Sequence, residues 1–374
     1  MNTSVTLTPK TSLEKALKKV GIEDPATITT LTIVGRVIES DIQNISENMR
    51  KTLQELDLSG ASFEKNELPN WIFGGSLISV TIPNSITEIN RYAFCCFNLT
   101  TITTNSENPV FASIDGVLYS KDKTELIKYP EGRQGDYVIP DSVTKINEAA
   151  FCRCIGLTSI TIPASVIEIG SQAFLDCSGL TSIVIPDSVT KIGESAFRHC
   201  SNLTSVIIPD SIRKIESGTF AYCSGLKSVA IPDSVTEIRR WAFQCCTALT
   251  SIAIPQSVTK IEQEYLGAFF RCTTTITVHP DNPIFSSEKG VLFNKDKTEL
   301  IAYPNIRQGK YHIPNSVTKI GNWAFSGCED LISIIIPDTV TNIGEDAFWY
   351  HRLNIMVHPD NPVYKVVDGK IERK

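Results

Sequence analysis

The sequence predicts a repeat solenoid: a right-handed coil with one long parallel β-sheet face, short helical or irregular turns opposite, and projecting β-hairpins. The first indication is an Ile-Pro pair whose proline recurs every 23 residues from Pro140 to Pro255, and again from Pro314 to Pro337. The second is that apolar residues keep the same offsets from that proline in each unit. A unit this short cannot bury its apolar side chains alone, so neighbouring units must stack on it.

Each unit is predicted to begin with a strand and to end with a turn. Leu180, Ile183 and Ile185 have the Leu-x-x-Leu-x-Leu spacing of strands in leucine-rich repeats. The proline that follows cannot donate to a sheet ladder, so it is predicted to end the strand. Further along the unit, Phe197 and Cys200 are three residues apart. That spacing predicts one helical turn that points both side chains inward.

Stacking places equivalent residues of successive units in columns. The phenylalanine column is Phe151, Phe174, Phe197, Phe220 and Phe243, and the cysteine column is Cys154, Cys177, Cys200, Cys223 and Cys246. We interpret the aromatic column as a core ladder rather than a cofactor slot. The cysteines recur at the repeat period and not at a zinc-ligand spacing, so buried, reduced thiols are expected. Disulfides between stacked cysteines stay open as an alternative.

The chain is predicted to have two parts. Residues 1–60 form an N-terminal cap of a helix and longer leucine-rich-type repeats. The elements expected in the cap are helices over residues 12–20 and 41–49 and strands at residues 31–33 and 56–58. Residues 61–374 form the stacked 23-residue repeats. Within them, hairpin modules are expected near residues 105–135 and 279–309, with a partial third module at 358–374.

The inserted modules share one sequence pattern. Asn108-Pro-Val-Phe and Asn282-Pro-Ile-Phe open the first two modules, and both later contain Lys-Asp-Lys-Thr. Apolar residues on either side of that turn predict two short strands, which form a β-hairpin that projects from the stack. A third copy begins at Asn361-Pro-Val-Tyr.

The composition is that of a soluble globular protein. The chain has 374 residues, with 42% hydrophobic and 20% charged residues and a formal net charge of −6. Its mild acidity argues against a nucleic-acid or anionic-membrane binder, which should carry a basic face. No apolar run reaches the length of a transmembrane helix, and residues 1–10 do not have the pattern of a signal peptide. We therefore expect no nucleic-acid partner and no membrane insertion.

No catalytic motif is present in the sequence, so we expect neither an enzyme, nor a cofactor, nor a metal site. His279 and His358 each lie in His-Pro-Asp-Asn-Pro, where a solvated loop histidine is favoured over a metal ligand. Glu168, Lys191, Lys214, Glu237 and Lys260 share one repeat column. We interpret that column as a solvated face of mixed sign; a charged docking stripe is the alternative.

The strand residue between the last two apolar positions should face the open side of the sheet. This column is the candidate partner-binding face, and it consists of Thr161, Val184, Ile207, Ala230, Ala253, His312 and Ile335, with Thr81 and Val138 earlier in the chain. Its middle is apolar, and an exposed apolar stripe is commonly a contact surface. The alternative is that β-branched residues simply suit strands.

The unit Leu-Thr-Ser-Ile-x-Ile-Pro-x-Ser-Val-x-x-Ile-Gly-x-x-Ala-Phe-x-x-Cys resembles that of the BspA-like leucine-rich repeat family, as do the Asn-Pro-x-Phe and Gly-Val-Leu-Tyr-Ser-Lys-Asp modules. The resemblance covers roughly residues 28–369. It implies a surface or secreted protein of bacteria or protozoa, of a kind implicated in adhesion to host matrix proteins or to other cells. If Met1 is the native start, the lack of a signal peptide favours the cytoplasm instead.

The predicted function is therefore non-enzymatic macromolecular interaction or adhesion through a preformed β face. The expected partner is a protein or glycoprotein, such as a host matrix protein. A passive spacer or scaffold is the alternative, and an enzyme with no recognisable motif is a third possibility. The sequence leaves the ligand and the oligomeric state undetermined.

Overall fold

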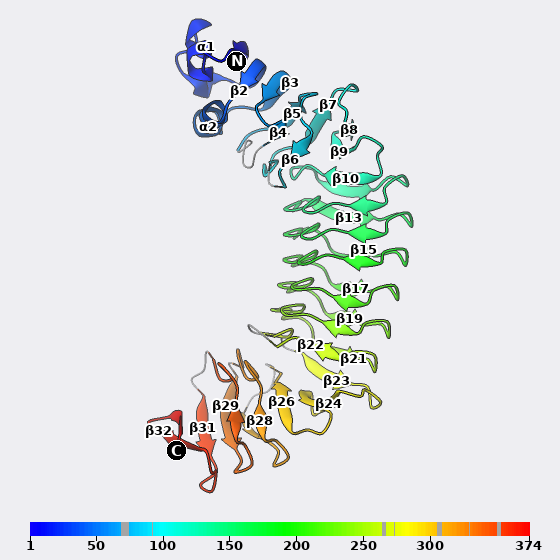
Figure 1. The fold of residues 1–374 in the computed structure, drawn as a ribbon, viewed down its shortest axis with the longest axis vertical. Helices are drawn as coiled ribbons and strands as arrows, with labels where there is room; N and C mark the ends of the chain where they lie inside the picture. Colours follow the sequence, from blue (N-terminus) through cyan, green and yellow to red (C-terminus); the bar gives the residue numbers. More distant parts are fainter. Residues whose placement is uncertain are drawn as a thin grey trace. The chain divides into compact units, whose positions relative to one another are not determined.

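The computed structural model describes residues 1–68, 75–91, 93–263, 267–272, 274–304, 309–328, 330–349 and 353–374. The chain divides into two compact units, Met1–Leu180 and Thr181–Lys374. Each unit is a β-solenoid in which successive coils stack strand upon strand (Figure 1). The predicted solenoid fold is thus confirmed. The predicted boundary between residues 60 and 61 stays a prediction.

The first unit begins with a five-stranded parallel sheet in the order β1-β2-β3-β5-β7. Its strands are β1 (Asn2–Leu7), β2 (Thr30–Val37), β3 (Glu55–Phe63), β5 (Ser79–Ile82) and β7 (Thr101–Thr104). The helices are α1 (Leu13–Lys19) and α2 (Glu39–Asn48), with the 3-10 turn η1 (Pro25–Thr27) between them. These helices correspond to the two expected from the sequence, whereas strand β1 was not expected.

Asp41 joins the two helices of the first unit. Its carboxylate is buried and accepts hydrogen bonds from the backbone N–H groups of Leu13, at 2.7 Å, and Ile38, at 3.1 Å. One side chain therefore satisfies an N–H group at the start of each helix, where no intrahelical partner exists.

The rest of the first unit has strands on two sides of each coil. One side carries the strands that the repeat pattern predicts, which we call the open-face strands. In this unit they are β11 (Gly135–Val138) and β13 (Leu157–Thr161), which pair in parallel. The other side carries two-residue strands: β4 (Glu67–Leu68), β6 (Glu88–Ile89), β12 (Lys145–Ile146) and β14 (Glu168–Ile169). The sequence pattern predicted the first of these sheets and missed the second.

The second unit repeats this arrangement. Its open-face strands are β15 (Ile183–Val184), β17 (Ser205–Ile207), β19 (Ser228–Ala230), β21 (Ser251–Ile254), β23 (Thr275–Val278), β27 (Gly309–His312), β29 (Leu331–Ile336) and β31 (Asn354–Val357). Its short strands are β16 (Lys191–Ile192), β18 (Lys214–Ile215), β20 (Glu237–Ile238), β22 (Lys260–Ile261), β28 (Lys319–Ile320) and β30 (Asn342–Ile343). Strands β18, β20 and β22 form one parallel sheet, and β15, β17 and β19 form another.

The third side of each coil is an irregular turn with a repeating conformation. Phe197 and Cys200 both point inward as predicted, and the Cys200 N–H donates to the Phe197 carbonyl at 3.2 Å. The predicted helical conformation is wrong, because Ser195 and His199 have positive φ angles of 55° and 62°. The backbone N–H groups of Ser195, Phe197 and His199 donate instead to carbonyls of the next coil, at 2.8–2.9 Å. Hydrogen bonds between coils therefore add to the local bonds of the turn, and left-handed residues aim N–H groups along the stack.

The predicted phenylalanine column forms the core of each unit. In the first unit the rings of Phe151 and Phe174 stack with their centroids 4.9 Å apart. In the second unit Phe197, Phe220 and Phe243 stack at 5.6 and 5.7 Å. The cysteine column is also buried beside the rings. Stacked rings in this range contribute beyond their burial, so the column holds neighbouring coils in register.

The hairpin modules have three strands rather than two. In the first unit these are β8 (Phe111–Ile114), β9 (Val117–Ser120) and β10 (Glu125–Lys128); in the second they are β24 (Phe285–Glu288), β25 (Val291–Asn294) and β26 (Glu299–Ala302). The third copy has β32 (Tyr364–Val367) and β33 (Lys370–Arg373). Strand β10 pairs in parallel with β12, and β26 with β28. The modules are thereby built into the second sheet of the coil, which covers a strand edge.

A buried asparagine holds each module to the preceding coil. Asn108, Asn282 and Asn361 have no exposed surface. The side chain of Asn282 donates to the carbonyls of Pro255 and Val258, and its oxygen accepts from the N–H groups of Ile284 and Phe285. Both ends of the amide are satisfied, which explains the asparagine at the start of every module.

Candidate interaction surface

Three residues of the predicted face lie side by side in the second unit. The backbone register pairs Val184 with Ile207, and Ile207 with Ala230. Val184 and Ile207 are 74% and 70% exposed, although the residues on either side of Ile207 along the strand point into the core. Strand β21 lies beside β19 and carries Ala253, also exposed. Period-two alternation of the strand therefore presents an apolar column to solvent.

The other predicted face residues lie in different sheets. His312 and Ile335 pair with each other across β27 and β29 in the second unit; His312 is exposed and Ile335 half-buried. Thr161 is exposed in the first unit, where it pairs with Val138. Val184, Ile207 and Ala230 are thus the register-paired part of the face, and Ala253 lies beside them on the neighbouring strand β21.

Hydroxyl side chains flank this apolar column. Exposed residues next to it in the same strands and their approaches are Thr181, Ser182, Thr204, Ser205, Lys227, Ser228, Thr250 and Ser251. Lys227 is the one charged residue in that set. We name the twelve residues, the apolar four and these eight, the open face. Hydroxyl and aliphatic groups are cheaper to dehydrate than charges, so this surface suits burial against a partner.

An acidic rim borders the open face. Asp187, Asp210 and Asp233 follow the strand-ending prolines of three successive coils, and all three are exposed. Their equivalent positions place three carboxylates in a row along the stack. The row gives one edge of the open face a negative potential.

The lysines and aspartates at the hairpin tips lie on exposed turns and are a second candidate for partner binding, but Lys295 and Asp122 are held by internal bonds. The ammonium group of Lys295 donates to the carbonyls of Pro280 and Asn282, at 2.8 and 2.6 Å. Asp122 accepts hydrogen bonds from the hydroxyl groups of Ser120 and Thr124 and from the N–H of Thr124. The bond from Ser120 contributes most to lowering the pKa of Asp122. These side chains shape the turn, which reduces what they can offer to a partner.

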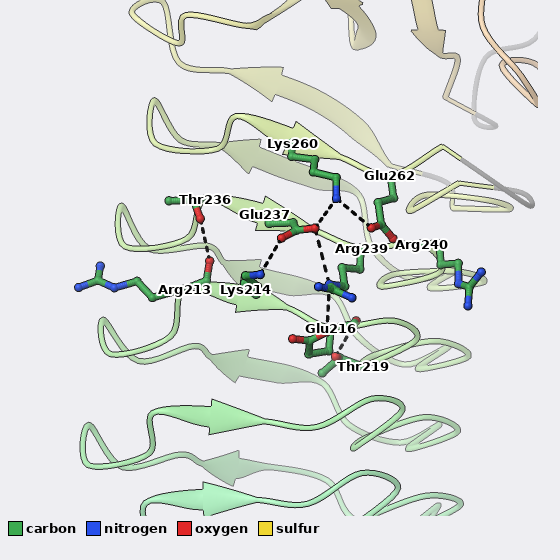
Figure 2. Close-up of polar contacts among 10 residues, drawn as sticks. All are labelled: Arg213, Lys214, Glu216, Thr219, Thr236, Glu237, Arg239, Arg240, Lys260 and Glu262. Carbon is green, nitrogen blue, oxygen red and sulfur yellow. Dashed lines mark hydrogen bonds and ion pairs between the residues drawn. The ribbon is translucent and has the colours of Figure 1, made fainter.

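The charged column on the other side of the second unit forms an ion-pair network around Glu237 (Figure 2). Its carboxylate lies 3.1 Å from Nζ of Lys214, 2.7 Å from Nζ of Lys260 and 3.6 Å from Nε of Arg239. The hydrogen bond from Lys260 is the largest cause that lowers the pKa of Glu237; burial acts in the opposite direction. The predicted solvated face of mixed sign therefore has a buried carboxylate at its centre.

A buried ion pair in the first module escaped the sequence reasoning. Nζ of Lys128 lies 3.7 Å from Oε1 of Glu131, and both side chains are almost fully buried. Burial raises the pKa of Glu131. Ala302 and Asn305 stand at the matching positions, 174 residues further on. Both charged residues are thus replaced together in the second module, and this joint replacement is the sequence signal that could have revealed their contact.

The described residues contain no group of three or more His, Cys, Asp or Glu side chains placed to hold a metal ion. His279 and His358 each accept a hydrogen bond at Nδ1 from the backbone two residues further on, so both shape their loops. No helix among the described residues is long and apolar enough to cross a membrane.

Comparison with known proteins gives a family match over most of the chain. The profile of the BspA type leucine-rich repeat region matches residues 50–135, 129–212, 201–308 and 301–365. No curated protein matches the chain in sequence.

Several solved structures are similar to this chain. A leucine-rich cell surface protein from Faecalibacterium prausnitzii is 33% identical, with 65% of this chain and 75% of that chain covered and a TM-score of 0.50. A leucine-rich repeat protein from Eubacterium ventriosum is 23% identical, with 72% and 82% covered and a TM-score of 0.49. The pneumococcal vaccine antigen PcpA is 23% identical, with 64% and 56% covered and a TM-score of 0.44.

Proposed function

Because the chain belongs to the BspA-type leucine-rich repeat family, we propose that it is a non-enzymatic interaction or adhesion protein that binds a protein or glycoprotein through the open face. The similar Faecalibacterium prausnitzii protein is described as a cell surface protein, which supports a role at the cell surface. The main observation behind the proposal is the exposed, register-paired column of Val184, Ile207 and Ala230.

The size of the open face supports a partner that also covers its rim. Strands β15 to β23 are spaced by about 4.8 Å, so five of them span roughly 20 Å. A standard interface hides about 800 Å² on each partner, more than the apolar column alone provides. The partner must then contact the turns with Asp187, Asp210 and Asp233. We expect a ligand with an apolar centre and basic residues along one edge.

The proposal is tested by binding to a panel of immobilised matrix proteins and glycoproteins. The double variant Ile207→Lys with Ala230→Glu keeps the net charge and places two charges on the open face, where desolvation on binding would be costly. We expect it to abolish binding while its circular dichroism and thermal melt stay those of the wild type. Changes at Lys121, Asp122, Lys295 and Asp296 on the hairpins should leave binding intact.

Two results would contradict the proposal. If the hairpin changes alone remove binding, the open face is only a structural surface. If the wild-type chain binds no member of the panel, a passive spacer becomes the better account. A spacer should tolerate every open-face substitution without loss of function.

A further inference from the structure

The second unit carries a basic patch on its short-strand side, distinct from the open face. We define it by its eight residues, Arg213, Lys214, Glu216, Glu237, Arg239, Arg240, Lys260 and Glu262 (Figure 2). We propose that this patch binds a sulfated polysaccharide. The site is additional to the open face, and binding to it can be measured separately.

The acidic groups of the patch lie beneath the basic ones. The side chains of Lys214 and Lys260 are 47% and 59% exposed, whereas Glu237, paired between them, is 11% exposed. Register explains the arrangement, because Glu237 lies on β20 between Lys214 on β18 and Lys260 on β22. Glu216 and Glu262 are likewise less exposed than the cations they contact. The surface presented to solvent is therefore cationic.

The eight residues of the patch carry more positive than negative charge. Arg239 Nε lies 3.1 Å from Glu216, and Lys260 Nζ lies 3.2 Å from Glu262. The five basic residues outnumber the three acidic ones by two, in a chain whose formal net charge is −6. The network holds the lysine and arginine side chains in place, so a ligand would order them at a lower entropic cost.

Two arginines extend the patch beyond the network. Figure 2 shows the guanidinium groups of Arg213 and Arg240 directed away from Glu237, on opposite sides of the network. Arg213 is exposed and donates to the carbonyl of Ser234 at 3.4 Å. Guanidinium groups bind the planar pairs of oxygens of sulfate or phosphate through two parallel hydrogen bonds. The patch therefore has guanidinium groups at both ends and ammonium groups between them.

A linear polyanion matches this layout better than a single anion. The cations lie on three successive coils, and coils are separated by about 4.8 Å. Each exposed cation contributes little to binding an isolated ion in water. Several contacts to one chain release several counterions together, which yields useful affinity.

Aromatic rings of the same unit favour a sulfated polysaccharide over a nucleic acid. Single-stranded nucleic acids need ring faces on which bases can stack. The guanidinium of Arg240 lies over the ring of Trp241 at 4.8 Å, and that of Arg198 over Tyr222 at 5.0 Å. His199 stacks on Tyr222 as well. Each of these rings thus has another side chain over at least one face, which leaves less room for a base to stack.

The test is the affinity of the full chain for fluorescently labelled heparin, measured by anisotropy at several salt concentrations. The variant Arg213→Gln with Lys260→Gln removes two charges from the patch, and Glu237 keeps Lys214 and Arg239 as partners. The matched control, Lys310→Gln with Lys365→Gln, removes two charges from exposed positions on β27 and β32, outside both the open face and the patch. Thermal melts by circular dichroism check that both variants fold. If the double patch variant does not fold, the single variant Arg213→Gln takes its place in the binding assay.

We expect the patch variant to lose affinity about tenfold or more at about 0.1 M salt, with the slope of log K against log salt reduced by about 2. The control should stay within about twofold of the wild type. Equal losses in both variants, equal binding of fully desulfated heparin, equal binding of a single-stranded oligonucleotide, or no binding by the wild type would each overturn the proposal. The open-face variant Ile207→Lys with Ala230→Glu should bind heparin normally, which separates this test from that of the proposed function.

Discussion

The thiol of Cys223 donates a hydrogen bond to the backbone carbonyl of Phe197, 3.1 Å away and 26 residues earlier in the chain. The same bond joins Cys246 to Phe220 in the second unit and Cys177 to Phe151 in the first. The cysteine column is thus fastened to the phenylalanine column of the preceding coil. A small side chain with a weak donor suits this place, where a purely apolar residue would leave the carbonyl with one bond fewer.

The structure makes a prediction about thiol reactivity. All eleven cysteines are thiols, and nine of them are buried. Burial raises the pKa of Cys223 to about 12, so only about one molecule in ten thousand is a thiolate near pH 8. Peptide mapping after brief alkylation of the native protein should find Cys223 unmodified, while half-buried Cys95 and Cys245 react first. In urea all sites should react. Rapid native labelling of Cys223, or its recovery in a disulfide, would refute this.

The phenylalanine column should dominate the stability of the second unit. Phe197 is fully buried, and its ring stacks on Phe220. Phe197→Ala should lower the free energy of unfolding by about 3–5 kcal/mol, because it leaves a cavity between coils. Urea denaturation measures the change. Phe97→Ala is the control: that ring is 51% exposed under Arg153, so its loss should cost less than about 1 kcal/mol. Similar losses for both variants would argue against the column.

The sequence predicted the coil period, the two core columns and the exposed strands. Each of these features repeats every 23 residues, so the apolar or polar character at one position tells which way its side chain points. The short second sheet was missed because a two-residue strand such as β20 is too brief to show alternation. The turn before Cys200 was mistaken for a helical turn, since a spacing of three suits either conformation. Its left-handed residues are not glycines at most positions, so no residue type marks them.

One of these left-handed positions offers a stabilising substitution. Ser195 has φ 55°, and Gly218 occupies the equivalent place in the next coil with φ 65°. A non-glycine residue in this region is strained by about 1 kcal/mol. Ser195→Gly should therefore raise the free energy of unfolding by up to about 1 kcal/mol. Ser205→Gly, within strand β17, should lower it by about 0.5–1 kcal/mol. Chemical denaturation of both variants checks the sign, and destabilisation by Ser195→Gly would count against the turn conformation.

The Glu237 network should make stability depend on pH. The pKa of Glu237 is lowered from its ordinary value of 4.5, chiefly by the hydrogen bond from Lys260. A depressed carboxyl pKa stabilises the fold above the unfolded-state value, and that contribution is lost as pH falls through the folded-state pKa. Glu237→Gln should cost on the order of 1 kcal/mol at neutral pH, since water screens the exposed lysines of the network. It should cost less near pH 3. The urea midpoints of the wild type and of Glu237→Gln are measured at both pH values. A stability difference between the two proteins that grows on acidification would contradict the prediction.

The open face as the site of partner binding is tested most directly by photo-cross-linking. A photoreactive phenylalanine analogue is placed at Ile207 on the open face in one protein and at Arg213 on the basic patch in another. Each is illuminated with a bound matrix protein, and cross-linked peptides are identified by mass spectrometry. The account predicts cross-links from position 207 and none from position 213. Cross-links from position 213 alone would show that the protein partner occupies the other side of the solenoid and would contradict the account.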